Sequence, residues 1–176
     1  MTNANIFTDA SANPKQKTGV GAYLIVSDEV IETQRKMNKD NLIRQIITVE
    51  FENTSSTRLE VQTVLSALDH YKQKLSDKYG GSIRLFTDSQ CVAGLLNRRT
   101  KLEANDFRSK GKKKPLKNAD LYREYYKLFD ELGFETIKVK GHLKSKYQDS
   151  IQRIFSLVDK RARKVLKKHS EGNKKS

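Results

Sequence analysis

The chain has 176 residues, which is enough for one domain of ordinary size with a substantial buried core. Its 35 lysine and arginine residues outnumber its 21 aspartate and glutamate residues, so the formal net charge is +14. A disulfide framework is excluded because Cys91 is the only cysteine, and the longest uncharged run, residues 18–27, is far shorter than the roughly 20 residues of a membrane-spanning helix.

Short apolar or alternating runs bounded by turn residues predict five strands. They lie at residues 6–9, 20–26, 46–51, 83–88 and 136–140. A further strand near Val30 has a weaker signal. Because the first three strands follow one another without a helical pattern between them, we expect them to form an antiparallel meander.

Apolar residues at helical spacing predict four helices after the third strand. The first spans about 61–75 behind a capping segment at 55–57, and a short one follows Ser89. Another covers 121–132 and ends at Gly133, and the last covers 151–165. The pattern predicts an α/β fold in which helices flank a mixed sheet.

The positive charge is concentrated in two segments of the chain. Residues 98–118 hold nine basic residues against two acidic ones, residues 160–176 hold eight against one, and the remainder is balanced. This pattern indicates contact with a polyanion, most simply nucleic acid. Neither segment carries the large apolar face that binding to a membrane surface would need. With no basic residue before Lys15 and no long apolar N-terminal run, we expect no signal peptide and a cytoplasmic location.

Four carboxylates stand at positions that suit a site. Residues 7–11 and 86–90 are near copies, in which Asp9 and Asp88 follow an apolar strand, at the edge of the sheet where ligands of α/β proteins bind. Glu60 and Asp159 border the apolar stripes of two predicted helices. Taken singly, the aspartates could be turn or capping residues, and the helix acids could form salt bridges with Arg58 or Arg163.

The alternative is that these carboxylates converge on divalent metal. Clustered carboxylates repel one another unless a cation neutralises them, and Mg²⁺ prefers oxygen ligands together with phosphate and water. Two such ions about 4 Å apart can activate a water and stabilise a leaving oxygen in phosphodiester hydrolysis. An acidic centre in a basic protein is what such an enzyme requires.

The ordered motifs resemble type 1 ribonuclease H over residues 6–166. They are Thr8-Asp9-Ala10-Ser11, Arg58-Leu59-Glu60, Thr87-Asp88-Ser89-Gln90, Lys140-Gly141-His142 and Val158-Asp159-Lys160-Arg161-Ala162-Arg163. The resemblance implies a ribonuclease H-like fold, with a five-stranded sheet of three antiparallel and then parallel strands. We expect one such domain over residues 1–168, with a basic protrusion at about 98–118 and a basic, disordered tail at 169–176.

The resemblance also implies an activity, namely cleavage of the RNA strand of RNA/DNA hybrids with two Mg²⁺ ions to leave 5′-phosphate and 3′-hydroxyl ends. Mn²⁺ is an alternative metal. Asp9 would bridge both ions, Asp159 would complete the site that activates water, and Glu60 and Asp88 would hold the second ion. His142 would match a mobile histidine assigned to proton transfer or product release, and histidine titrates near neutrality.

Substrate contacts are expected in three groups of residues. They are Ser11 and Asn13 near the first turn, Ser56, Thr57, Arg58 and Gln90 near the carboxylates, and Lys112, Lys113, Lys114 and Lys117 in the protrusion. Ser55, Ser56 and Thr57 stand where the family usually has asparagines that touch the minor groove, and their hydroxyls can still hydrogen-bond a 2′-OH.

Several alternatives stay open from the sequence. Asp149 is a second candidate for the fourth acid, although it precedes the apolar periodicity and resembles a helix N-cap. The rival functions are a nucleic-acid-binding module of the same fold without turnover and a related nuclease that acts on another duplex. We expect a monomer with no obligate protein partner, because no heptad or large exposed apolar stripe is present.

Overall fold

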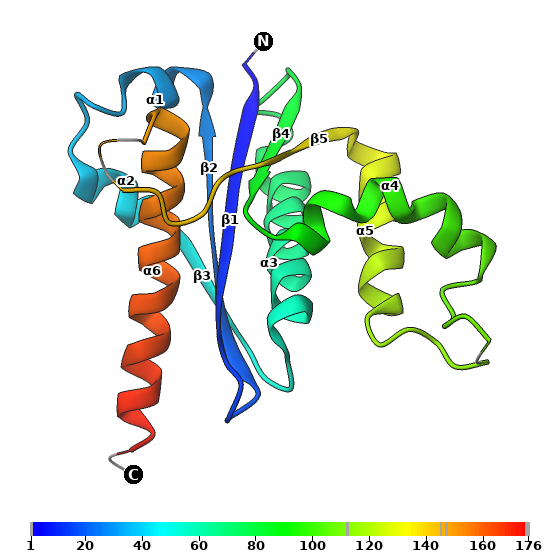
Figure 1. The fold of residues 1–176 in the computed structure, drawn as a ribbon. Helices are drawn as coiled ribbons and strands as arrows, with labels where there is room; N and C mark the ends of the chain where they lie inside the picture. The colour runs from blue at the N-terminus through cyan, green and yellow to red at the C-terminus, as the bar shows by residue number, and fades with distance from the viewer. Residues whose placement is uncertain (1, 112, 145, 147, 175–176) are drawn as a thin grey trace.

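The computed structural model describes residues 2–111, 113–144, 146 and 148–174, and a five-stranded mixed sheet lies at its centre (Figure 1). The strands are β1 (Ala4–Asn13), β2 (Thr18–Ser27), β3 (Ile47–Phe51), β4 (Ile83–Thr87) and β5 (Phe134–Lys138). Their order is β3-β2-β1-β4-β5. The first three strands pair antiparallel, whereas β4 runs parallel to β1 and to β5. The predicted fold class is therefore confirmed.

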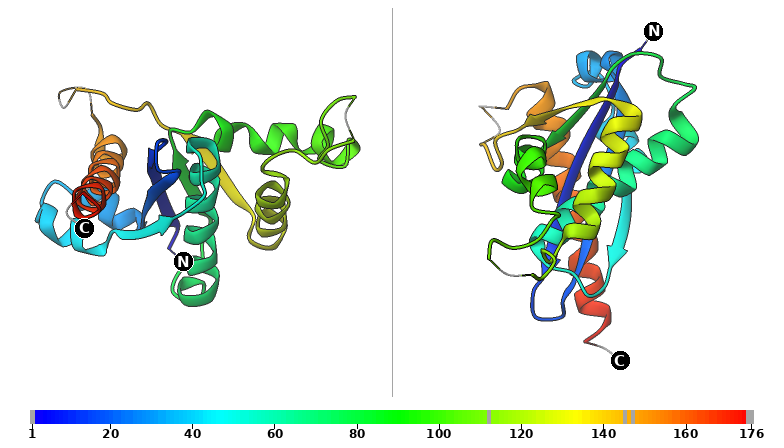
Figure 2. Two further views of the ribbon diagram at one scale, coloured as in Figure 1. Left: turned by 90° about the horizontal axis from the view of Figure 1, so that it is seen from below. Right: turned by 90° about the vertical axis from the view of Figure 1, so that its right-hand side faces the viewer.

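Helices cover both faces of the sheet (Figures 1 and 2). The helices are α1 (Asp28–Thr33), α2 (Lys39–Gln45), α3 (Ser56–His70), α4 (Gln90–Ala104), α5 (Ala119–Leu132) and α6 (Ser150–Gly172), and one π-helical turn, η1 (Tyr71–Leu75), continues α3. The apolar core is split accordingly. Phe7 and Phe86 face α6 with Phe155, while Ile6 and Leu85 belong to the cluster that α3 and α5 complete. Among the described helices, none has the length and apolar character needed to cross a membrane.

The segment between β2 and β3 differs from the prediction. It holds α1 and α2 in place of a strand near Val30, so the first three strands do not follow one another directly. Ser27 caps α1 by accepting a hydrogen bond from the Val30 backbone N–H at 3.4 Å, and Asn38 caps α2 in the same way. Ile31 is buried in the cluster formed with α6. The β-branched pair at 30–31 suggested a strand, but the cap and this packing determine a helix.

Two helices are longer than predicted. The helix after Ser89 runs from Gln90 to Ala104, because Leu102 extends its buried face beyond Leu95. The last helix continues to Gly172, four residues into the segment expected to be a disordered tail. Its final turns are held by contacts that the sequence pattern does not reveal. His169 pairs with Glu50 at 2.6 Å, and Asn13 donates a hydrogen bond to Ser170 at 3.5 Å.

Strand β2 approaches α3 closely at Gly21. A Cβ atom at this position would overlap Oγ1 of Thr63 and lie 2.9 Å from its Cβ. Thr63 is buried and donates a hydrogen bond to the Leu59 carbonyl at 2.8 Å, so it has little freedom to move away. The glycine is thus required by the distance between the sheet and the helix.

We predict that Gly21→Ala lowers the free energy of unfolding by roughly 1–3 kcal/mol through overpacking. Gly94→Ala is the matched control, since Gly94 lies inside α4 and a Cβ there meets nothing within 4 Å. That control is expected to raise the free energy of unfolding by about 0.5–1 kcal/mol, because alanine is the better helix former. Urea unfolding of both variants checks this, and equal effects from the two would contradict the packing explanation.

Candidate active site

Two aspartates are placed by the register of the parallel strands β1 and β4. Phe7 pairs with Phe86 at the end of this ladder, so Asp9 and Asp88 each lie two residues further along. β4 ends at Thr87, whereas β1 continues to Asn13, so the prediction that Asp9 stands at a strand end is wrong. Beyond Phe7, β1 is no longer paired with β4. Asp9 therefore lies just beyond the end of the β1–β4 ladder although it is within a strand, and it is only 4% exposed.

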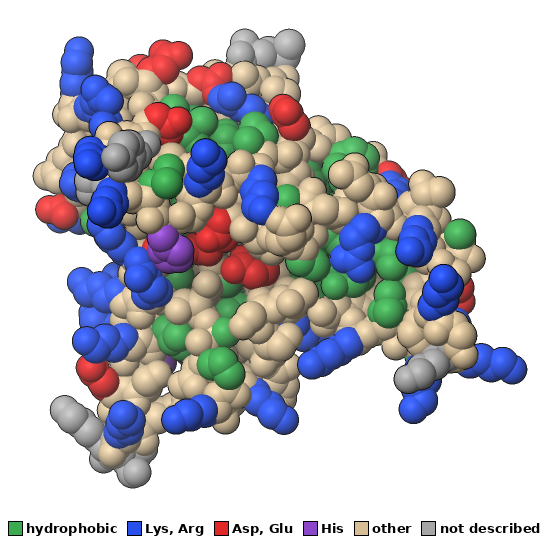
Figure 3. Space-filling view, viewed as in Figure 1, with side chains coloured by type: hydrophobic (Ala, Val, Ile, Leu, Met, Phe, Trp, Pro, Cys, Tyr) green, Lys and Arg blue, Asp and Glu red, His purple; other side chains and the backbone are tan. Residues whose placement is uncertain are grey.

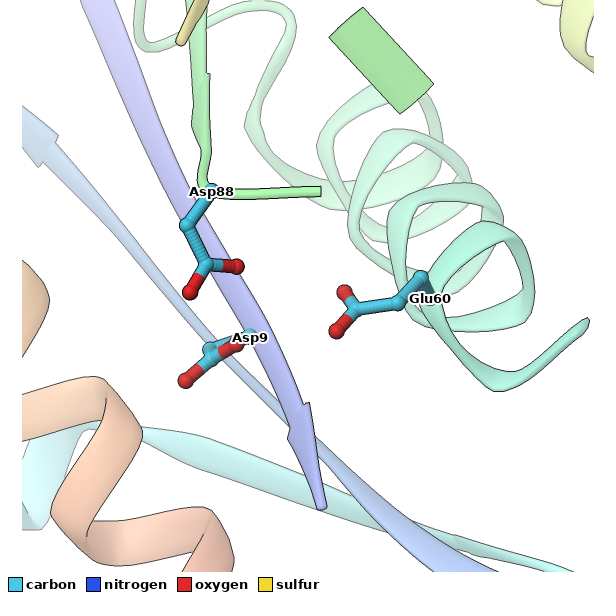
Figure 4. A group of neighbouring side chains, drawn as sticks. All are labelled: Asp9, Glu60 and Asp88. Carbon is cyan, nitrogen blue, oxygen red and sulfur yellow. The ribbon is translucent and has the colours of Figure 1, made fainter. Parts of the chain in front are cut away.

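The third carboxylate comes from the first turns of α3. Ser55 fixes where that helix begins, because its hydroxyl accepts a hydrogen bond from the Arg58 backbone N–H at 3.3 Å. Glu60 then points toward the two aspartates (Figure 4). One oxygen from each of Asp9, Glu60 and Asp88 lies within 4.8 Å of the others. The structure thus brings together three of the four acids that the sequence singled out.

Asp159 approaches the group from α6, on the other face of the sheet. Its carboxyl group lies within hydrogen-bonding reach of Asp9, although it is not one of the three whose oxygens lie within 4.8 Å. It also accepts a hydrogen bond from Arg163 at 2.5 Å, which is the salt bridge that the sequence offered as the alternative, and its role as a metal ligand stays a prediction. Asp149 caps α6 by accepting from the Gln152 backbone N–H at 2.9 Å, which is the structural role expected for it.

The crowded carboxylates hold protons tightly. Burial is the main cause that raises the pKa of Asp9 to about 10, followed by its hydrogen bond with Asp159 and the charges of Glu60 and Asp88. Burial, together with the charges of Asp88 and Asp159, raises the pKa of Glu60 to about 8. The pKa of Asp88 is also raised, again mainly by burial. The site therefore disfavours a full set of negative charges unless a cation is bound.

The donor set fits a divalent metal ion. Every candidate ligand atom is a carboxylate oxygen, which is the donor type that Mg²⁺ prefers. In addition, Oε2 of Glu60 is buried without a hydrogen-bond partner in the described part of the chain. A buried carboxylate oxygen with no partner is costly in free energy, and a bound cation would remove that cost.

His142 lies beside the acidic group on the loop that follows β5. The histidine is exposed and adopts a left-handed backbone conformation with φ of 56°. Its charge favours the ionised form of Asp88, so it lowers the pKa of that carboxyl against the larger effect of burial. His142 and Asp159 line one pocket of about 250 Å³, together with Lys144, Lys160 and Arg163. None of these three cations was predicted as a site residue, although Lys160 and Arg163 stand in the motif around Asp159 and in the basic segment 160–176.

A second pocket, of about 480 Å³, lies between the β1–β2 turn and the start of α3. Its polar lining includes the predicted contacts Ser56, Arg58 and Lys117, and also Lys17 and Asn53, which the sequence analysis missed. The two sides of the pocket are tied together by a hydrogen bond from the Thr54 backbone N–H to the Lys17 carbonyl at 2.9 Å.

Arg58 makes a contact that the sequence did not predict. Its guanidinium forms a bidentate pair with Asp120, with distances of 3.1 and 2.9 Å, and an additional bond with Asn118 at 3.4 Å. This pair joins the start of α3 to the start of α5 and fixes the guanidinium at the pocket wall. A substrate contact by Arg58 is therefore limited to the part of the group that Asp120 leaves accessible.

The other predicted substrate contacts are scattered over the surface around the acids. Asn13 bonds with Gln16 and Ser170, and Gln90 accepts a hydrogen bond from Lys138. Lys113 and Lys114 are exposed on the loop that joins α4 to α5, on the side of the sheet away from α6 (Figures 1 and 2). Ser11 lies half-buried in β1 and Thr57 is exposed at the start of α3, whereas Lys112 lies outside the described residues.

Solved structures with this arrangement of strands and helices define the fold as that of an RNase H domain. The solution structure of the PFV RNase H domain is 18% identical, with a TM-score of 0.61 and coverage of 93% of this chain and 92% of that one. An N-terminal RNase H domain from Mycobacterium tuberculosis is 10% identical, with a TM-score of 0.58 and coverage of 98% and 99%.

Sequence comparison identifies the family. The RNase H family pattern matches residues 1–166, so the chain belongs to the RNase H family. The ribonuclease H of Treponema denticola is 29% identical over 161 residues, covering 86% of this chain and 94% of that protein. The ribonuclease H of Clostridium botulinum is 26% identical over 157 residues, covering 88% and 93%. The prediction of an endoribonuclease, a hydrolase, is confirmed at this level.

Proposed function

We propose that this protein is a metal-dependent endonuclease that hydrolyses the RNA strand of RNA/DNA hybrids, leaving 5′-phosphate and 3′-hydroxyl ends. The observation that carries the proposal is the carboxylate group of Asp9, Glu60 and Asp88, with an unpartnered oxygen on Glu60, in a chain of net charge +14. Such a site favours a cation, and the surrounding positive charge favours a polyanionic substrate. A monomer in the cytoplasm is the form in which we propose that it acts.

Asp9, Glu60, Asp88 and Asp159 are the residues that would hold the metal, as two Mg²⁺ ions or alternatively Mn²⁺. When bound, these ions would supply an activated water and stabilisation of the leaving oxygen. The buried Asp9 interacts with both Asp159 and Asp88, so it would hold metal together with either of them. His142, exposed at the rim beside Asp88, is placed to move a proton to or from a group entering from solvent.

The pocket beside the start of α3 supports the proposed substrate. Its lining combines the cations Lys17, Arg58 and Lys117 with the hydroxyl of Ser56. Arginine and lysine suit phosphate oxygens, and hydroxyls can hydrogen-bond a ribose 2′-OH, which DNA lacks. We therefore propose that this pocket holds the backbone of the hybrid while the carboxylates act on the RNA strand.

A cleavage assay tests the proposal. The protein is incubated in Mg²⁺ with a labelled RNA/DNA hybrid, an RNA duplex and a DNA duplex, with EDTA and an Asp88→Asn variant as controls. We expect cleavage of the RNA strand in the hybrid alone, and its loss in both controls. Hybrid binding without Mg²⁺-dependent cleavage would contradict the enzyme, and preferential cleavage of another duplex would contradict the substrate. Activity that survives Asp88→Asn would contradict the assigned site.

The lysines of the α4–α5 loop give a separate prediction about binding. Lys113→Gln/Lys114→Gln is expected to reduce the salt dependence of hybrid binding, because each lost phosphate contact lowers the log–log slope by roughly 0.9 for a duplex. Both side chains are exposed, so stability is expected to remain unchanged. Fluorescence anisotropy at several salt concentrations in EDTA measures the slope, and a slope equal to that of the unaltered protein would mean that this loop is only solvated.

A further inference from the structure

Helix α6 carries a row of cations on the side opposite to its buried face. Lys160, Arg163, Lys164 and Lys167 are all exposed, and their spacing of i, i+3, i+4 and i+7 places them on one side of the helix. We call these four residues the α6 basic face. The core-facing side of the same helix is formed by Ile154, Phe155, Val158 and Ala162. Because all four residues belong to one helix, their side chains form a preformed array.

The α6 basic face is poorly compensated within the protein. Arg163 pairs with Asp159, but no ion pair of Lys160, Lys164 or Lys167 with an acidic side chain occurs among the described residues. Neighbouring like charges at i, i+3 and i, i+4 repel each other along a helix. Phosphates of a bound polyanion would neutralise these cations and reduce their mutual repulsion. The cations would in turn displace counterions from the polyanion, which favours binding.

The position of the α6 basic face relates it to the acidic centre. Its first members, Lys160 and Arg163, line the pocket that His142 and Asp159 also line. Lys167 lies about 11 Å from Lys160 along the helix axis, at a rise of 1.5 Å per residue. In the space-filling view, acidic side chains lie near the middle of the side of the molecule that is shown, with lysine and arginine side chains to the left and right of them (Figure 3). The loop joining α4 to α5 is on one side of the sheet, and α6 is on the other (Figure 1).

We propose that the α6 basic face is a second docking surface for duplex nucleic acid, which binds the phosphate backbone of the duplex arm on the α6 side of the cleavage point. This proposal rests on the proposed function, since the acidic centre defines where the duplex crosses the molecule. The α4–α5 loop and α6 would then hold the substrate from two sides. The α6 basic face would contact backbone phosphates, so its binding would not depend on base sequence.

The test neutralises the part of this face that does not line the pocket of Asp159. Lys164→Gln/Lys167→Gln is compared with the control Lys74→Gln/Lys78→Gln, two exposed lysines at η1 and just after it, in the continuation of α3 on the opposite face of the sheet. Binding of a long RNA/DNA hybrid is measured by anisotropy in EDTA across a salt series. The α6 variant is expected to lose roughly 1 to 2 from the log–log slope and about tenfold in affinity at low salt. The control is expected to retain both values.

Further arms separate the possible outcomes. Lys164→Arg/Lys167→Arg keeps the charge and is expected to bind like the unaltered protein, and thermal melts check that all variants are folded. An unchanged slope in the folded glutamine variant, or an equal loss in the control, would overturn the docking surface. So would a selective loss of binding to anionic phospholipid vesicles without any loss on the hybrid. Binding is measured without metal and therefore does not depend on cleavage. A protein that binds the hybrid through α6 but does not cleave it would contradict the proposed function and not the docking surface.

Discussion

Asp9→Asn is expected to abolish metal-dependent cleavage and at the same time to stabilise the metal-free protein. The substitution removes a carboxylate that contacts Asp88 and Asp159 and lies within 4.8 Å of Glu60. Loss of a central metal ligand costs several kcal/mol of transition-state stabilisation, so we expect a rate at least about 10³-fold lower. Asp9 must take up a proton on folding at neutral pH because its pKa is raised, whereas the amide is neutral in both states, so the free energy of unfolding in EDTA should rise by on the order of 1–3 kcal/mol.

Asp149→Asn is the matched control for this substitution. It makes the same change from carboxylate to amide, but at a helix N-cap where asparagine serves equally well. We expect cleavage and stability to remain within experimental error of the unaltered protein. Cleavage assays and urea unfolding report the two properties of each variant. An Asp9→Asn protein that is less stable in EDTA would contradict the strained carboxylate group, and one that still cuts would contradict its role.

Without metal, the stability of the protein is expected to fall as the pH rises from about 5 to 8. In the unfolded chain Asp9 and Glu60 lose their protons near pH 4, whereas in the folded protein their pKa values are raised to about 10 and about 8. Across this window the folded state therefore binds more protons than the unfolded state, so raising the pH favours unfolding. The loss should reach on the order of a few kcal/mol by pH 8.

The surface carboxylates act in a different pH range. Asp106, Asp120 and Asp130 are paired with arginines that lower the pKa of each carboxyl, so their stabilising effect is lost only below about pH 4. Urea unfolding in EDTA between pH 5 and 8 isolates the buried group. Excess Mg²⁺ is expected to reduce the pH dependence. Asp9→Asn is expected to remove the contribution of Asp9 and to leave that of Glu60, whose pKa is raised by burial and by the charges of Asp88 and Asp159. A stability that rises with pH in EDTA would contradict the raised pKa values.

Local patterns were sufficient to predict most of the fold. The five strands and the helices after β3 all carry their own signals of periodicity and capping, such as Gly133, which ends α5 in the left-handed conformation. The α1–α2 segment was missed because its two helices are short and depend on packing against α6. The length of α6 was missed because its last turns are held by Glu50 and Asn13, which lie far away in the chain.

The candidate site was predictable for a related reason. Asp9 and Asp88 belong to near-identical segments, and two parallel strands in register bring such segments side by side. Glu60 was found because an acid beside an apolar stripe must face the sheet. Two features could not be predicted in this way, because both depend on tertiary contacts across loops. Arg58 forms an ion pair with Asp120, and Lys17 lines the same pocket as Ser56. The catalytic and substrate-binding roles of these residues remain predictions.

The claim that these carboxylates form a metal centre is tested most directly by anomalous diffraction. Crystals of the protein with a non-cleavable RNA/DNA hybrid are soaked in Mn²⁺, and an anomalous difference map is calculated. We predict two Mn²⁺ peaks among the oxygens of Asp9, Glu60, Asp88 and Asp159, next to a phosphate of the RNA strand. A map with Mn²⁺ bound elsewhere and none among these carboxylates would contradict the account.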